Sequence, residues 1–214
     1  MSPARPYGEE NFRQLLELLA ARTPTPGGGS AAALGGAIGG ALGCMAIRFS
    51  MKRKDSTPET DAVLAELERG LVELAARLTR LADDDADSFE AVRAARKLPQ
   101  GTPAELATRT ATIAAASERS AAVPLATARL CREGMELIDG ALGAVNRNLA
   151  TDAGSGVVML RAAARCAAWN VLVNLVGDAG AAAAARRDEV AKLLARTAEL
   201  ERRATEWTEA VLRG

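Results

Sequence analysis

The stretch GGGSAAALGGAIGGALGCMAI, residues 27–47, is uncharged and rich in glycine and alanine, and it is the strongest indication of the fold in this chain. Two ladders at intervals of four run through it, Gly35, Gly39 and Gly43 in one and Gly36 and Gly40 in the other. On a helix, such ladders make flat stripes where a second backbone can approach closely. Each glycine costs a helix about 1 kcal/mol, so five of them need tight packing as an offset. We expect a central helix packed within the core or across a dimer interface.

The same stretch is long enough to span a bilayer. Glycine and alanine, however, contribute little insertion energy compared with the leucine of an ordinary membrane span. We therefore expect a core helix of a soluble protein and no membrane partner.

Breaker residues divide the rest of the chain into further helices. The expected helices are 11–22, 30–50 with Ser30 as N-cap, 57–97, 104–142, 152–176 and 186–212. We expect a kink at Pro124, a break at Gly134 and a polar turn over residues 146–154. The fold class is thus all-α, a compact multi-helix bundle with long antiparallel helices in a single domain, residues 1–214.

Composition excludes several classes of function. Lysine and arginine together number 27, as do aspartate and glutamate, so no net basic field attracts nucleic acid. Histidine is absent, so we expect no metal site and no permanently bound cofactor, and acid/base chemistry falls to other side chains, carboxylates first. Three cysteines without a CxxC pair, and an N-terminus without a signal-peptide pattern, predict a cytoplasmic protein.

One carboxylate interrupts the apolar stripe of the helix expected from residue 57. The stripe consists of Leu64, Leu67, Leu71, Leu74, Leu78 and Leu81, and its spacing continues to Asp85 and Ser88. Burying a carboxylate is costly unless it is paired, hydrogen-bonded or protonated. Either partial desolvation raises the pKa of Asp85 so that it shuttles a proton, or Asp85 pairs with an arginine or belongs to a solvated acidic face.

Three further groups have both a binding and a structural interpretation. Residues 27–30 either offer backbone N–H groups to an anion or form a plain turn with an N-cap. The basic residues 52–54 either hold the carboxylates of a ligand or form a solvated loop. Asn170 and Asn174 either hydrogen-bond the amide edge of a heterocycle or bond between helices.

Six short motifs follow one another along nearly the whole chain. They are PTPGGGS at 24–30, DDDADSF at 83–89, KLP at 97–99, VPL at 123–125, NRNLATDAG at 146–154 and NVLVNL at 170–175. In this order they resemble the cyclodeaminase family, which comprises the cyclodeaminase half of formiminotransferase-cyclodeaminase and free-standing methenyltetrahydrofolate cyclohydrolases. Thr151 stands where the family has serine and keeps the hydroxyl group.

The resemblance implies a homodimer that binds a tetrahydrofolate derivative as substrate. It implies one of two reactions at the N5–N10 bridge: hydrolysis of 5,10-methenyltetrahydrofolate to 10-formyltetrahydrofolate, or conversion of 5-formiminotetrahydrofolate to the methenyl compound and ammonia. A helical scaffold and a folate-binding protein without chemistry are the competing classes.

The resemblance also implies roles for individual residues. Asp85 would transfer the proton, with Asp83 the weaker candidate. Asp152, Asn170 and Asn174 would orient the pterin ring, and the 27–30 turn with the 52–54 loop would hold the glutamate carboxylate. The full set of expected folate-binding residues is Gly27, Gly28, Gly29, Ser30, Lys52, Arg53, Lys54, Asn146, Asn148, Asp152, Asn170 and Asn174.

Overall fold

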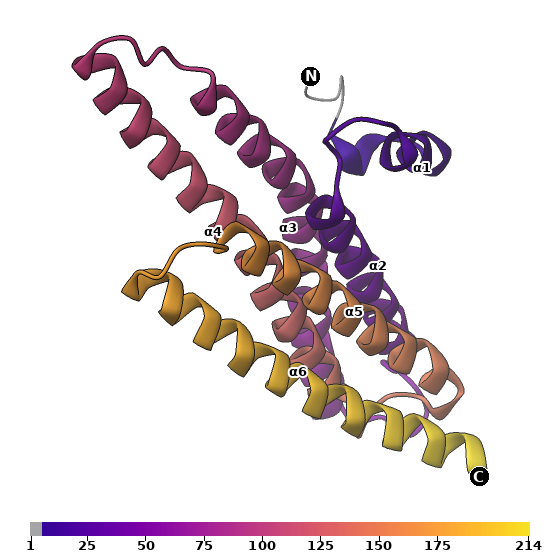
Figure 1. Ribbon diagram of the computed structural model, residues 1–214. Helices are drawn as coiled ribbons and strands as arrows, with labels where there is room; N and C mark the ends of the chain where they lie inside the picture. The colour runs from indigo at the N-terminus through magenta and orange to yellow at the C-terminus, as the bar shows by residue number, and fades with distance from the viewer. Residues whose placement is uncertain (1–5) are drawn as a thin grey trace.

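A computed structural model of the chain describes residues 6–214, and this part is helical without a strand (Figure 1). The α-helices are α1 (Phe12–Ala20), α2 (Gly28–Arg48), α3 (Pro58–Arg96), α4 (Pro103–Ala141), α5 (Ala150–Asn174) and α6 (Ala181–Arg213). Two 3-10 turns, η1 (Tyr7–Glu9) and η2 (Arg147–Leu149), lie before α1 and α5. The all-α prediction is confirmed.

Helix α2 lies at the centre, in contact with α3, α4 and α5. Its closest approach is to α5, where a Cβ on Gly39 would lie 2.8 Å from the carbonyl oxygen of Gly156. A Cβ on Gly156 would in turn lie 2.9 Å from the carbonyl oxygen of Gly39. Glycine at both positions therefore lets the two backbones touch, as the ladder predicts. Gly35, by contrast, has open space around its Cβ direction.

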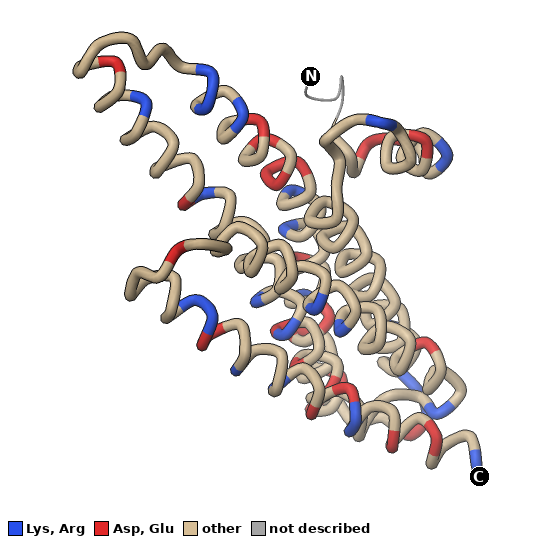
Figure 2. Tube along the Cα trace, in the orientation of Figure 1, with Lys and Arg blue, Asp and Glu red and all other residues tan. Residues whose placement is uncertain are grey.

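Two helices, α2 and the stretch Arg147–Asn174, are long and apolar enough to cross a membrane by length and composition. In the fold, 56% of the apolar window of α2 is buried against other helices. Figure 2 shows the positions of charged residues along the outer helices, whereas α2 has almost none. This arrangement supports the interpretation of α2 as a core helix.

Helices α3 and α4 form a long antiparallel hairpin whose turn projects beyond the other helices (Figure 1). Both begin at a threonine cap followed by proline, Thr57 before α3 and Thr102 before α4. Leucines of the predicted stripe pack into the core, and Leu71 and Leu78 are fully buried. Because Asp85 continues the spacing of this stripe, it also faces the interior.

Four expected helix starts or breaks are wrong. Helix α2 begins at Gly28 with Gly27 as N-cap, because the Ser30 hydroxyl bonds to α3 instead of capping its own helix. Helix α4 continues through Gly134, whose missing side chain leaves room for leucines of α3 and α5. The polar turn expected over 146–154 ends at α5, which begins at Ala150. In addition, the alanine run after Gly180 extends α6 to Ala181, five residues earlier than expected.

The cysteines behave as small core residues. Cys44 and Cys131 are buried, Cys166 is half-buried, and all are free thiols. Burial raises the pKa of Cys131 to about 12, so its thiol stays protonated at neutral pH.

Candidate active site

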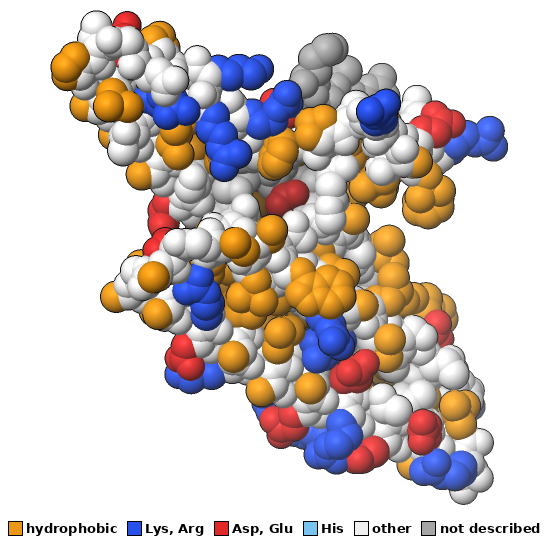
Figure 3. All heavy atoms as spheres, viewed as in Figure 1, with side chains coloured by type: hydrophobic (Ala, Val, Ile, Leu, Met, Phe, Trp, Pro, Cys, Tyr) orange, Lys and Arg blue, Asp and Glu red, His pale blue; other side chains and the backbone are white. Residues whose placement is uncertain are grey.

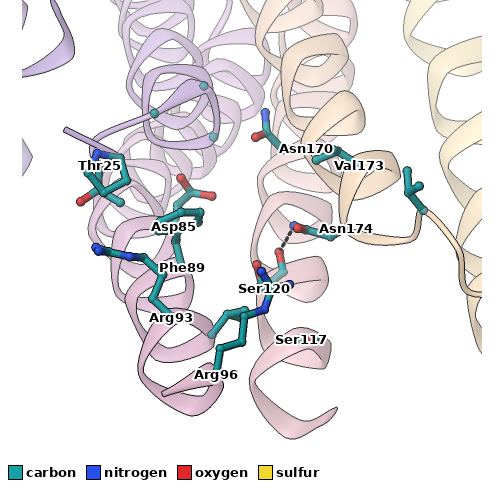
Figure 4. A pocket seen from close by; sticks show the side chains of 16 residues that line it. Thr25, Asp85, Phe89, Arg93, Arg96, Ser117, Ser120, Asn170, Val173 and Asn174 are labelled. Atoms are coloured by element: carbon teal, nitrogen blue, oxygen red, sulfur yellow. Dashed lines mark hydrogen bonds between the residues drawn. The ribbon is translucent and has the colours of Figure 1, made fainter. Parts of the chain in front are cut away.

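A pocket of about 480 Å³ opens where four helices meet around the start of α2 (Figure 4). Its walls are the loop and first turn of α2, the second half of α3, the middle of α4 and the last turn of α5. Figure 3 shows this face as a hollow with an acidic side chain recessed in it and basic side chains along its rim. Phe89, Val92, Val173 and Val176 make part of the lining apolar.

Among residues 6–214, Asp85 is the only carboxylate that lines the pocket. Its Oδ2 lies 3.1 Å from the Ser30 hydroxyl, which also lies 2.9 Å from the carbonyl oxygen of Ala82. A backbone hydrogen bond from Ser30 reaches Asp85 as well. The acidic group at the N-terminus of α2 is therefore the carboxylate of Asp85, which lies where the helix dipole favours negative charge.

Opposing effects act on the charge of Asp85. Desolvation by burial raises its pKa above the ordinary value, and the hydrogen bonds from Ser30 lower it by a smaller amount. Within residues 6–214, no lysine or arginine lies at ion-pair distance from Asp85, whereas the adjacent Asp84 pairs with Arg119. The alternative of a structural ion pair at Asp85 is thus not found in the described part of the chain. A carboxylate with a raised pKa in a pocket is suited to proton transfer.

Asp83 lies on another face of α3. Its Oδ1 accepts a hydrogen bond of 2.8 Å from the backbone N–H of Tyr7, so it anchors η1 to α3. Desolvation raises the pKa of Asp83, but this carboxylate does not line the pocket. The geometry therefore favours Asp85 over Asp83 as the proton-transfer group.

Asn170 and Asn174 both line the pocket from α5. The Asn170 side chain donates a hydrogen bond of 2.9 Å to the carbonyl oxygen of Cys166, and its amide group lies against Gly28. The Asn174 side chain donates a bond of 2.8 Å to the carbonyl oxygen of Ser120 on α4 (Figure 4). Each amide nitrogen is thus oriented by a backbone carbonyl. The predicted bond between helices exists for Asn174, and both side chains border the cavity.

Several residues that line the pocket were not predicted from the sequence. They are Pro24, Thr25, Phe89, Val92, Arg93, Arg96, Ser117, Ser120, Val173 and Val176. Helical spacing from Asp85 would have placed four of these ten on its own face of α3, because positions 89, 92, 93 and 96 lie one, two and three turns further along the helix. The serines of α4 carry no comparable pattern in the sequence.

The other predicted folate-binding residues lie at the opposite end of the bundle. Residues 52–54 follow the C-terminus of α2, about 30 Å along that helix from its N-terminus. There the backbone N–H of Lys52 bonds to Asp61, and Arg53 pairs with Asp55. Lys54 is exposed in the same loop. Within one chain the structure therefore does not bring this basic loop to the pocket.

Asn146, Asn148 and Asp152 belong to the same distal end. The backbone N–H of Asn146 bonds to the Ser50 hydroxyl, and the Asn146 side chain caps η2 at Asn148. Asp152 lies in the first turn of α5, about 27 Å along the helix from Asn170. These residues shape the turn beneath α2, and their role toward a folate stays a prediction.

No group of histidine, cysteine, aspartate or glutamate suited to a metal ion occurs in the part of the chain that the structure describes.

Comparisons with known proteins agree on one family. The model of the family described as formiminotransferase-cyclodeaminase matches residues 11–192. A methenyltetrahydrofolate cyclohydrolase from Methylorubrum extorquens is 39% identical over 92% of this chain and 94% of its own length. The formimidoyltransferase-cyclodeaminase of Rattus norvegicus is 30% identical over 81% of this chain, which corresponds to 32% of the rat protein.

The fold has a close counterpart among solved structures. The crystal structure of formiminotetrahydrofolate cyclodeaminase from Thermotoga maritima matches with a TM-score of 0.80. The match covers 96% of this chain and 98% of that one, at 23% sequence identity. It supports the all-helical architecture.

Proposed function

Because this chain belongs to the formiminotransferase-cyclodeaminase family, we propose that it is a folate one-carbon enzyme, and specifically a methenyltetrahydrofolate cyclohydrolase. The observation that carries this proposal is the carboxylate of Asp85, half-desolvated in a pocket between apolar walls and side-chain amides. The similarity to the Methylorubrum enzyme over nearly the full length of both chains supports the choice of reaction.

The proposed hydrolysis proceeds through a tetrahedral carbon between N5 and N10. Water attacks the cationic methenyl carbon, and Asp85 takes one proton from it as the C–O bond forms. The C–N5 bond then breaks, N5 gains a proton, and the remaining hydroxyl proton leaves as the formyl C=O forms. One water is consumed and one proton is released for each 10-formyltetrahydrofolate made. The negative charge of Asp85 also stabilises the cationic bridge before attack.

Ser30 suits both protonation states of Asp85. When Asp85 is ionised, the Ser30 hydroxyl can donate to Oδ2 at 3.1 Å. When Asp85 carries a proton, the same hydroxyl can accept from it and donate to the Ala82 carbonyl at 2.9 Å. Asp85 can therefore gain and lose a proton without leaving a buried polar group unpaired.

The two asparagines are proposed to orient the pterin ring. Each amide nitrogen already donates one of its two N–H groups to a backbone carbonyl, so the side-chain oxygen and the second N–H of Asn170 and Asn174 are left to face a ligand. A pterin presents N–H donors along its amide edge, which match such acceptors. Phe89 and Val92 offer apolar surface to the aromatic part of the substrate.

Cyclodeamination of 5-formiminotetrahydrofolate is the second candidate, supported by the rat relative and by the shared tetrahedral carbon. The test mixes the purified protein with 5,10-methenyltetrahydrofolate and follows loss of its near-ultraviolet absorbance against buffer. Loss supports the cyclohydrolase. Appearance of that band from 5-formiminotetrahydrofolate, with release of ammonia, supports the cyclodeaminase instead. If a folded protein shows neither change, the enzyme proposal is wrong and a binding or scaffold protein remains.

We also propose that the chain forms a homodimer through the outer face of α2 and α5. A shallow apolar groove runs there between Gly35 and Met159, bordered by Trp169. The exposed fractions of Ile38 and Trp169 are 48% and 57%, and Gly35 leaves room for a second backbone. A two-fold axis that packs α2 against its copy would bury this groove. A cytoplasmic location is likewise proposed, on the basis of the three free cysteines.

A further inference from the structure

The two basic side chains that line the pocket are Arg93 and Arg96, both on α3. They follow Asp85 by eight and eleven residues, which places them about 12 and 16 Å further along the helix axis. In Figure 4, Arg93 and Arg96 lie on the side of the pocket away from Asn170, toward the α3–α4 turn. The pocket therefore carries negative charge at its inner end and positive charge at its outer rim.

Both guanidinium groups retain donors for a ligand. Arg93 uses Nη1 to bond both oxygens of Glu90, at 2.8 and 3.1 Å, so its other nitrogens are not committed to that carboxylate. In the part of the chain that the structure describes, the Arg96 guanidinium has no carboxylate within ion-pair distance. The backbone carbonyl of Arg96 accepts a bond of 3.3 Å from Arg109 of α4, which brings a third cation to the rim.

We infer that Arg93 and Arg96 bind the glutamate tail of the folate, and this inference rests on the function proposed above. A guanidinium group matches a carboxylate in a planar, two-bond geometry. With the cationic bridge against Asp85, the benzoyl ring passes Phe89 and Val92 and the tail carboxylates reach the arginines. Further γ-linked glutamates then follow the α3–α4 turn toward Arg109.

This assignment replaces the expected role of the basic loop within one chain. Residues 52–54 lie about 30 Å away along α2, whereas Arg93 and Arg96 line the same cavity as Asp85. The partner's loop in a dimer is the competing source of positive charge. The test must therefore compare the two arginines with the loop directly.

The test measures KM and kcat with 5,10-methenyltetrahydrofolate as monoglutamate, as triglutamate, and as the pteroate analogue that lacks glutamate. We expect R93Q/R96Q to raise KM for the monoglutamate about 10- to 100-fold, with kcat nearly unchanged. We expect the same variant to leave KM for the pteroate analogue within about threefold of wild type, because the lost contacts involve only carboxylates. Circular dichroism and the melting temperature establish that the variant is folded.

The matched control is K52Q/R53Q/K54Q, which removes the same kind of charge from the distal loop. We expect it to keep the wild-type preference for glutamylated substrate. If this triple variant loses that preference and R93Q/R96Q keeps it, the inference is wrong and the loop of a second chain binds the tail. If R93Q/R96Q impairs the pteroate analogue as strongly as the monoglutamate, the arginines do not act on the tail, and the inference is also wrong.

Failure of the proposed function has a different outcome. If wild-type protein turns over none of these compounds, the dissociation constants of tetrahydrofolate and tetrahydropteroate are measured by calorimetry for the same three proteins. A wild-type preference for tetrahydrofolate that R93Q/R96Q abolishes supports the tail site in a protein without the reaction. Equal affinity of the wild type for both compounds overturns it.

Discussion

The carboxylate of Asp85 lies in the space that a side chain on Gly29 would occupy, with Oδ2 2.6 Å from the ideal Cβ position. An α3 carboxylate can therefore reach the first turn of α2 only because residue 29 has no Cβ. The glycines at the start of α2 thus leave room for the carboxylate of Asp85, which is a more specific role than breaking a helix.

Substitution of Gly29 tests this contact. We expect Gly29→Ala to displace the Asp85 carboxylate and to lower kcat/KM at least about 100-fold, the usual scale of a lost proton-transfer group. The melting temperature should change little, because Asp85 is a flexible side chain and alanine favours a helix. The measurement is a steady-state assay beside thermal unfolding. A fully active variant would show that the position of Asp85 is not critical.

The pH dependence of activity follows from the raised pKa of Asp85. Asp85 must be ionised to accept a proton, so kcat/KM should rise with pH through a pKa above the ordinary aspartate value of about 3.9. Asp85→Asn should lose about 10²- to 10⁴-fold in rate and the acidic limb of the profile. Asp83→Asn is the matched control, because Asp83 lies outside the pocket. Equal losses in both variants would contradict the assignment.

The same pKa shift predicts a cost in stability. Since the folded pKa of Asp85 is raised by desolvation, the folded state binds a proton that the unfolded chain has already released. Stability contributed by this group therefore falls as pH rises from about 3.9 to the folded pKa, and stays low above it. Asp85→Asn should melt higher than wild type at neutral pH, with the difference vanishing in acid. Melting curves over this range measure it; a lower melting temperature at neutral pH would count against the prediction.

The crossing of α2 and α5 is expected to tolerate no side chain. Gly39→Ala places a methyl group 2.8 Å from a backbone carbonyl of α5, so the helices must separate at a cost of about 1–3 kcal/mol. Gly35→Ala is the control when both substitutions are made in the Trp169→Glu background, where no second chain is expected to cover α2; its added methyl then meets open space and should stabilise the helix by up to about 1 kcal/mol. Urea unfolding gives both values. Equal effects would show that the ladder glycines are equivalent.

The proposed dimer predicts a change in mass on charging its surface. Trp169 is exposed on the outer face of α5, where the Arg165 guanidinium lies 5.6 Å from its ring centroid. We expect the wild type to run as a dimer in light scattering after gel filtration, and Trp169→Glu to run as a monomer. Val63→Glu on α3 is a control at another exposed apolar site. A monomeric wild type would refute the interface.

Much of the fold follows from periodicity along the chain. The leucine stripe and the glycine ladder predict long helices, and in the structure the leucines pack into the core while Gly39 lets the backbones of α2 and α5 touch. The boundary at Ser30 was mispredicted because a hydroxyl that suits an N-cap bonds instead to a neighbouring helix. Such a choice between local and tertiary hydrogen bonds is invisible in the sequence.

Some residues of the candidate site could likewise be predicted from the sequence, and others could not. Asp85 could be selected from the sequence because a carboxylate on an apolar stripe demands compensation, and Asn170 and Asn174 because they sit one turn apart. The spacing places Arg93 and Arg96 on the same face of α3 as Asp85, but the sequence does not show that this face borders a cavity, because the cavity forms only when α4 and α5 pack against it.

The sequence by itself determined the helical class, the close packing of α2 and the one carboxylate that has to be compensated. Only the tertiary structure decided which polar residues share a pocket. Helices α2 and α5 run the length of the bundle, so residues at their opposite ends, such as Asp152 and Asn170, are separated by a rigid rod whose length is fixed by the helix rise. Helix α3, in contrast, returns Asp85 to the start of α2 across more than fifty residues of chain, because the buried leucines hold the two helices together.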